Sequence, residues 1–353
     1  MNLGLSTNLI RRDFMTLATR PAVKTLGDYA YQAIQKHFKK ALKWEKTVKK
    51  DEDPEALHQM RVGMRRLRTA VTRFGFVVDL PKAVTDRNIG KIARCLGNLR
   101  DLDVLKESVE KNFQPHLPSQ ELKHLEKAFD AIDKQRGQAL TGVKEIFKHA
   151  RYKSLKHSLD NGREEPKYKE LAPLPIDLVL PDLLLPEVSY FFLHPGWQFG
   201  MPLGSNNGAS TSTSLLRSYP KGMTSTQVEQ NLDSNHEVLH SLRKQAKRLR
   251  YQMELFTDFY GESYGEHLTE VKNIQDILGE IHDSDVLEDW LIDVFGEDFT
   301  EKLPTFTSLL VDKRHQMWQQ WAPIQKRYTQ LDTRNQLHLA ILEPMSFQEN
   351  EDN

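Results

Sequence analysis

Residues 58–68 of the chain read HQMRVGMRRLR, and residues 240–250 read HSLRKQAKRLR. Both stretches follow the pattern His-x-x-Arg-x-x-x-(Arg/Lys)-Arg-Leu-Arg. Each precedes a second matched phrase, LGNLRDLDVL at 96–105 and LGEIHDSDVL at 278–287. The two pairs keep one offset along the chain, because His240 follows His58 by the same interval as Leu278 follows Leu96. Two motifs that keep one register over this interval predict a duplicated structural unit.

On an α-helix, each copy separates into an apolar stripe and a neighbouring basic stripe. In the first copy the apolar stripe has the spacing of a core-facing surface and consists of Leu57, Met60, Met64, Leu67 and Val71. The basic stripe beside it consists of His58, Arg61, Arg65 and Arg68, flanked by Arg66. The basic stripe of the second copy consists of His240, Arg243, Lys247 and Arg250, flanked by Arg248.

The two basic stripes contain no acid of their own. No carboxylate occurs within 58–73 or 240–250, although surface helices usually place acids four residues from their bases. An external polyanion could neutralise these charges, and so could acids of neighbouring helices such as Asp101 and Asp283. Because both copies place the bases next to the apolar stripe rather than opposite it, we favour a shared basic groove.

The two phrases and their duplication resemble the CHAD domain, the conserved-histidine α-helical domain, from about Thr25 to the C-terminal helix apart from one insertion. The resemblance implies an all-α fold, an internally duplicated helical bundle with pseudo-two-fold symmetry around a basic central cavity. It also implies that this cavity binds inorganic polyphosphate. The residues by themselves predict only the doubled basic stripe.

These expectations assign a role to each residue of the two phrases. The residues expected to bind polyphosphate are His58, Arg61, Arg65, Arg66, Arg68, His240, Arg243, Lys247, Arg248 and Arg250. The residues expected to orient them are Arg100, Asp101, His282 and Asp283.

Changes in composition along the chain predict five segments. They are an N-terminal extension (1–21), a first helical half (22–160), a flexible Pro/Gly/Ser-rich insertion (161–234), a second helical half (235–345) and a polar tail (346–353). The insertion could also dock a protein partner through its aromatic residues. Its apolar run at 178–193 is interrupted by Pro181 and Pro186, so it is too short for the ~20 apolar residues of a membrane span.

The overall charge and the single cysteine restrict the classes of partner. Lys and Arg together number 49, as do Asp and Glu, so any attraction to an anion must come from local clustering. The lone Cys95 excludes an intramolecular disulfide, and residues 1–20 lack the apolar core of a signal peptide, which favours a cytoplasmic protein.

Catalysis and cofactor binding are disfavoured. The chain has no Gly-rich phosphate loop, no cofactor motif and no Glu-x-Glu-x-Lys strand motif of a triphosphate tunnel enzyme. Asp101 and Asp103 point about 200° apart on a helix, so they cannot hold one metal ion together.

Nucleic acid is disfavoured as a ligand because Met, Leu, Val and Ala, rather than aromatic residues, alternate with the basic side chains of the two stripes. The alternatives are a helical protein-interaction scaffold and a metal-dependent phosphohydrolase.

Overall fold

The structure is a computed structural model that describes residues 25–160, 166–198 and 224–345. Every regular element in these ranges is a helix, so the predicted all-α fold is confirmed. The helices are α1 (Leu26–Leu42), α2 (Glu45–Lys50), α3 (Pro54–Phe74), α4 (Asp86–Ser108), α5 (Ser119–Lys148), α6 (Ala150–Asp160), α7 (Ile176–Phe192), α8 (Ser225–Leu255), α9 (Glu262–Phe295), α10 (Phe299–Lys302), α11 (Pro304–Tyr328) and α12 (Leu331–Leu342). No described helix is both long enough and apolar enough to cross a membrane.

The two basic stretches lie on α3 and α8, which begin differently. Asp53 caps α3 by accepting a hydrogen bond from the Glu55 N–H, and Pro54 occupies the first turn. We expected Ser234 or Asn235 to cap the second basic helix, but α8 begins at Ser225. Asn235, which matches Asp53 in the register of the two motifs, instead forms a kink with φ −137° and ψ 15°. The start predicted from the second motif is therefore a bend within a longer helix.

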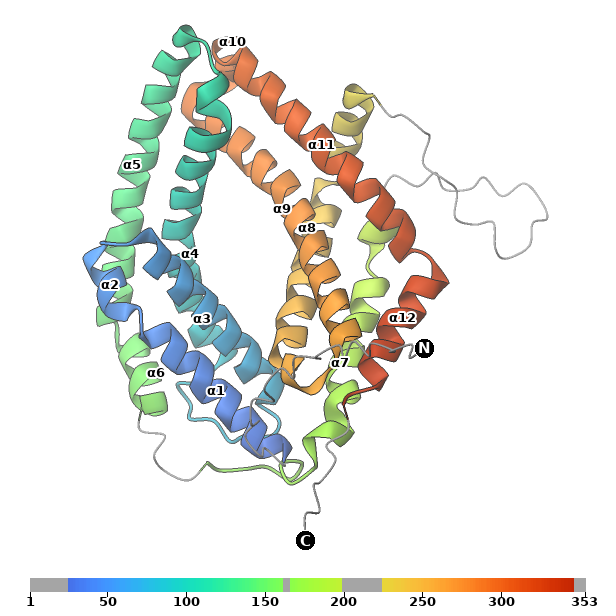
Figure 1. The fold of residues 1–353 in the computed structure, drawn as a ribbon. Helices are drawn as coiled ribbons and strands as arrows, with labels where there is room; N and C mark the ends of the chain where they lie inside the picture. Colours follow the sequence, from blue (N-terminus) through green and yellow to red (C-terminus); the bar gives the residue numbers. More distant parts are fainter. Residues whose placement is uncertain (1–24, 161–165, 199–223, 346–353) are drawn as a thin grey trace, which may run out of the picture.

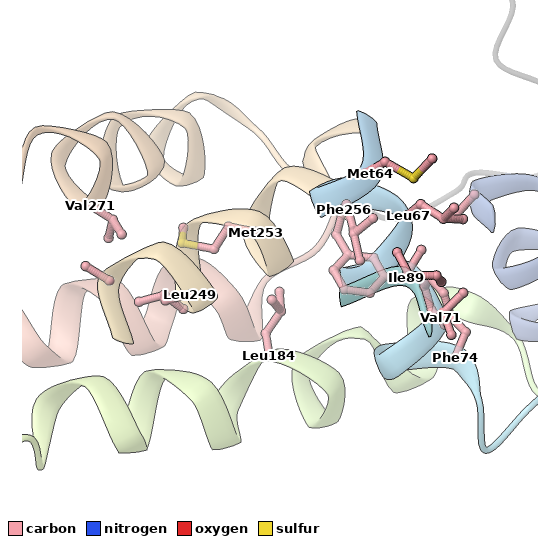
Figure 2. Packing of buried hydrophobic residues seen from close by; sticks show 14 of the residues in the cluster. Met64, Leu67, Val71, Phe74, Ile89, Leu184, Leu249, Met253, Phe256 and Val271 are labelled. Carbon is pink, nitrogen blue, oxygen red and sulfur yellow. The ribbon is translucent and has the colours of Figure 1, made fainter. Parts of the chain in front are cut away.

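A large apolar cluster joins α3 to α8. The apolar stripe of α3 is buried, and its Met64, Leu67 and Val71 lie near Met253 and Phe256, at the end of α8, in the cluster shown in Figure 2. Burial of such a side chain stabilises the fold by about 1.5–3 kcal/mol. This cluster includes residues of α1 and α7 and forms most of the core.

A second, smaller apolar cluster joins the same two parts of the chain at the other end. Its twelve buried residues include Val109 and Phe113 after α4, Leu125 on α5, Phe299 on α10 and Phe306 on α11. Figure 1 shows α3 and α4 on one side of the molecule and α8 and α9 on the other. The two basic helices are thus held between two separate apolar contacts. The pseudo-two-fold symmetry itself stays a prediction.

The segment predicted to be a flexible insertion contains a helix. Residues 176–192 form α7 despite Pro181 and Pro186, so the prediction of flexibility is wrong there. Leu180 and Leu184 are fully buried, while Pro186 is exposed, which places its missing hydrogen bond on the wetter side of the helix. Burial of the apolar face therefore outweighs the cost of the prolines. The remaining Gly/Ser-rich tract at 205–214 lies outside the described residues, as do 1–21 and 346–353.

A buried glutamate links α5 to α11. Glu121 is only 3% exposed, and its two carboxylate oxygens accept hydrogen bonds from the backbone N–H groups of Thr305 (2.9 Å) and Phe306 (3.0 Å). These are N–H groups of the first turn of α11, which its own helix leaves without acceptors. Glu121 therefore serves as the N-terminal cap of a helix that is distant in sequence.

We expect Glu121→Ala to lower the free energy of unfolding by about 2 kcal/mol, because two buried N–H groups lose a charged acceptor. Urea unfolding followed by circular dichroism measures this change. Glu126→Ala, at an exposed position of the same helix, is the control and should be close to neutral. A loss of less than about 0.5 kcal/mol for Glu121→Ala, which is the range of ordinary surface substitutions, would contradict the assigned role.

Candidate functional site

The bases of α3 and α8 face a common region around Lys247. Burial lowers the pKa of Lys247 to about 7, and repulsion from Arg243, Arg65 and Arg61 adds to the lowering, while Asp283 opposes it. Arg61 and Arg65 belong to α3, whereas Lys247 belongs to α8. The cations of the two helices are therefore close enough to repel one another.

Two arginines of this region each pair with the first aspartate of an Asp-x-Asp phrase. Arg61 Nη2 lies 2.9 Å from Asp101 Oδ1, and Arg243 Nη2 lies 3.2 Å from Asp283 Oδ1. The same contact thus occurs at matching positions of the two copies of the motifs. Both arginines are largely covered, at 18% and 15% exposed, whereas Asp101 and Asp283 are 64% and 52% exposed. Each aspartate therefore stays accessible to solvent while it pairs with an arginine that is largely covered.

A glycine of each Leu-Gly phrase lies directly beneath the paired guanidinium. A Cβ at Gly97 would lie 3.5 Å from Arg61 Nε, and one at Gly279 would lie 3.3 Å from Arg243 Nε. The nearest neighbour of both glycines is thus an arginine side chain rather than the backbone of another helix. At Gly279 an added Cβ would crowd the guanidinium, whereas at Gly97 it would make an ordinary van der Waals contact.

Two further carboxylates hold the flanking arginines. Glu254 of α8 accepts hydrogen bonds from Arg66 Nε (3.1 Å) and Nη2 (3.0 Å), and its other oxygen lies 3.6 Å from Arg250 Nε. One carboxylate is therefore shared by a cation from each basic helix. Arg68 forms a two-pronged pair with Asp86, with distances of 2.6 and 2.9 Å.

Three of the predicted bases form no ion pair within the described residues. Among residues 25–160, 166–198 and 224–345, no carboxylate lies within ion-pair distance of Arg65, Lys247 or Arg248. Lys247 and Arg65 are half-buried, and Arg248 is exposed. The centre of the site thus presents a guanidinium and an amine without a fixed partner.

The histidines of the site are neutral near neutral pH. Burial, with the cations around them, lowers the pKa of His58 and His240, and it lowers the pKa of His282 to about 3. The rings of His240 and His282 lie 3.9 Å apart between centroids. In the first half, the position equivalent to His282 is Arg100, whose charge contributes to lowering the pKa of His58. The two halves therefore differ in charge at this position.

The second aspartate of each phrase turns away to the outer helices. Asp103 accepts a hydrogen bond from Arg136 Nε of α5 (2.7 Å), and Arg136 also holds Asp51 with two bonds of 2.8 Å. Asp285 lies 3.8 Å from Arg314 of α11, which is 5% exposed. Arg314 further pairs with Glu229 and Glu288. These contacts follow from the opposite directions of the two aspartates.

Sequence reasoning did not find Glu254, Arg136 or Arg314 as partners of the motif residues. The only sequence signal for Glu254 is its position four residues after Arg250. No local pattern relates Arg136 to Asp103 or Arg314 to Asp285. The described residues contain no group of three or more His, Cys, Asp or Glu side chains placed to hold a metal ion.

A family model described as "CHAD domain" matches residues 32–292, which is well over half of the chain. The chain belongs to the CHAD family. No curated protein matches it.

Two solved structures share the CHAD fold of this chain. The CHAD domain from the plant Ricinus communis has 19% identity and a TM-score of 0.51, with 91% of this chain and 94% of that chain covered. PptA from Streptomyces chartreusis has 12% identity and a TM-score of 0.57, with 91% and 100% covered. At these identities the likeness supports the fold alone.

Asp101 and Asp103, the two aspartates of the phrase at 96–105, should differ in their effect on stability. Asp103 is 9% exposed and Asp101 is 64% exposed. Asp103→Asn leaves the partly buried Arg136 short of one charged partner, and we expect it to lower the free energy of unfolding by roughly 1–3 kcal/mol. Asp101→Asn should cost less than about 1 kcal/mol, because its pair is exposed on one side. Chemical denaturation of both variants checks this order, and equal losses would contradict it.

Proposed function

We propose that this CHAD protein binds inorganic polyphosphate, without hydrolysing it, in a basic hollow between α3 and α8. The observation that carries the proposal is the meeting of the bases of both helices at Lys247, with Arg65 and Lys247 left without a carboxylate among the described residues. Two like-charged helices in contact are costly unless an anion neutralises them. A chain of phosphates supplies many negative charges at a regular spacing.

The local charge balance supports an anionic ligand. Of the eight Arg and Lys side chains predicted to bind phosphate, five pair, within the described parts of the chain, with four carboxylates, Asp86, Asp101, Glu254 and Asp283. When all eight bases are protonated, a surplus of four positive charges stays in this region, although the whole chain has a formal net charge of zero. The clustering gives local attraction where the net charge gives none.

The surroundings of Asp283 favour charge-assisted hydrogen bonds in the proposed site. Its side chain is 52% exposed, yet the surrounding protein raises its pKa by desolvation, with Glu280 and Asp101 adding to the rise and Arg243 and Lys247 opposing it. The carboxylate is therefore partly desolvated, and charge-assisted hydrogen bonds beside it are screened less than on an open surface.

The chemistry of the site favours phosphate without bases over nucleic acid. Guanidinium groups donate two parallel hydrogen bonds to phosphate oxygens and stay protonated, so their proposed role is binding rather than proton transfer. Base stacking requires exposed aromatic faces. Tyr251, beside the basic stripe of α8, has its ring covered on one face by Arg250, with the guanidinium carbon 4.5 Å from the ring centroid.

We expect Arg65→Ala combined with Lys247→Ala to weaken polyphosphate binding by about 100-fold, because each charged hydrogen bond contributes about 1.5–3 kcal/mol. Calorimetry with long-chain polyphosphate measures the loss, and triphosphate and single-stranded DNA are compared in parallel. Lys123→Ala with Lys127→Ala, which removes two exposed charges from α5, is the control. Unchanged affinity in the Arg65/Lys247 variant, or tighter binding of DNA than of polyphosphate by the wild type, would disprove the proposal.

Binding should also depend on pH through Lys247. Its pKa of about 7 leaves it partly neutral at pH 7–8, and a bound polyanion favours the protonated form, so affinity should fall as pH rises from about 6.5 to 8.5. Below this range, protonation of His58 and His240 should add further attraction for the polyanion. Because the pKa of each histidine is lowered, this gain should come at a lower pH than for an ordinary histidine. Lys247→Arg keeps the charge at all these pH values and should flatten the profile. Calorimetry in buffers of different ionisation enthalpy detects the proton uptake, and an equally steep profile in Lys247→Arg would contradict the role of Lys247.

A further inference from the structure

A second cluster of cations lies on the first half of α4. Arg87, Lys91 and Arg94 follow one another at i, i+4 and i+7 and therefore form one stripe. Arg87 and Arg94 are exposed. Repulsion from Arg151, at the start of α6, and from Arg87 lowers the pKa of Lys91, with Arg94 contributing. Four bases from two helices therefore lie together on this surface.

This basic surface of α4 and α6 is not neutralised by the protein. In the parts of the chain that the structure describes, none of Arg87, Lys91, Arg94 and Arg151 forms an ion pair. Ordinary helices with bases at this spacing place acids between them. Residues 87–100 of α4 contain no acid, so the stripe keeps its full positive charge.

The cluster is continuous with the proposed polyphosphate site. The guanidinium of Arg68 lies against Gly90, and that of Arg61 lies against Gly97. Arg94 lies between these two glycines in sequence and about 40° from Gly90 around the helix axis. Asp86 is the first residue of α4. Its pKa is lowered by Arg68 of α3, and Arg248 of α8 contributes to this lowering. Bases of α3 and α8 thus reach the edge of α4 that carries the cluster.

The corresponding surface of α9 lacks this stripe. In the register of the two motifs, the positions that match Arg87, Lys91 and Arg94 are Thr269, Asn273 and Asp276, and all three are exposed. The motif residues of the two halves match, but their outer surfaces do not. A polyanion in the hollow would therefore meet stronger attraction on the side of α4 than on the side of α9.

We infer that the anion-binding surface extends from the hollow between α3 and α8 across α4 to Arg151, so that a long phosphate chain leaves the hollow over the first half of the protein. This inference rests on the proposed function. It assigns to Arg87, Lys91, Arg94 and Arg151 contacts that only chains longer than the hollow can make. Because these bases lie at the surface, each contact is weak, and their effect comes from their number and varies with salt.

The test compares chain lengths in the variant Arg87→Ala/Lys91→Ala/Arg94→Ala. Calorimetry at fixed salt measures the affinity of the full-length protein for triphosphate and for a polyphosphate of about 100 units. We expect the variant to bind triphosphate within about twofold of the wild type and the long chain about tenfold more weakly. The variant Lys123→Ala/Lys127→Ala/Lys134→Ala removes the same exposed charge from α5 and should bind both ligands as the wild type does.

The possible outcomes separate the two proposals. A loss confined to the long chain in the α4 variant alone supports the extended surface. Unchanged binding of the long chain, an equal loss for both ligands, or an equal loss in the α5 variant overturns it. Failure of the wild type to bind either ligand defeats the proposed function itself, whatever the variants do. Since Lys91 is partly exposed and the other substituted side chains are exposed, circular dichroism is expected to show an unchanged fold.

Discussion

Contact between two positively charged helices is the constraint on which the arrangement of the molecule depends. Repulsion between the cations of α3 and α8 is offset in two ways. Glu254 lies between Arg66 and Arg250, one from each helix, and beneath the charges Met64, Met253 and their neighbours bury apolar surface. The apolar contact holds the helices together, and the shared carboxylate removes part of the charge where the helices meet. Among the described residues, Arg65, Lys247 and Arg248 have no such carboxylate partner.

The helices that carry the Asp-x-Asp phrases connect the basic helices to the outside of the molecule. On α4, Asp101 holds Arg61 of α3, and Asp103 on the opposite side holds Arg136 of α5. On α9, Asp283 holds Arg243 of α8, and Asp285 faces Arg314 of α11. A spacing of two residues turns successive side chains to opposite sides of a helix. The repeated phrase therefore positions three layers of helices with two side chains.

Local patterns predicted the parts of this structure that local physics decides. The buried stripe of α3 depends on the spacing of apolar residues within one helix, and it was predictable. The helix start expected at residue 234 or 235 is a kink at Asn235, because α8 is already capped by Thr224. The basic motif carries no signal for this earlier start. The helix α7 was missed because tertiary burial of Leu180 and Leu184 outweighs proline there. Ionic partners such as Glu254 and Arg314 depend on which helices become neighbours, and a single sequence carries no signal for that.

The two apolar contacts that bracket the charged centre are unequal in size. The smaller cluster contains twelve buried residues, whereas the larger one includes residues from α1 to α12. Local opening requires less free energy where fewer apolar contacts must separate. Amide hydrogens around Phe113 and Phe299 should therefore exchange with solvent by a sub-global opening, while those of α3 and α8 exchange only when the whole chain unfolds. The helices around the charged centre would then separate transiently at the smaller cluster and stay in contact at the larger one.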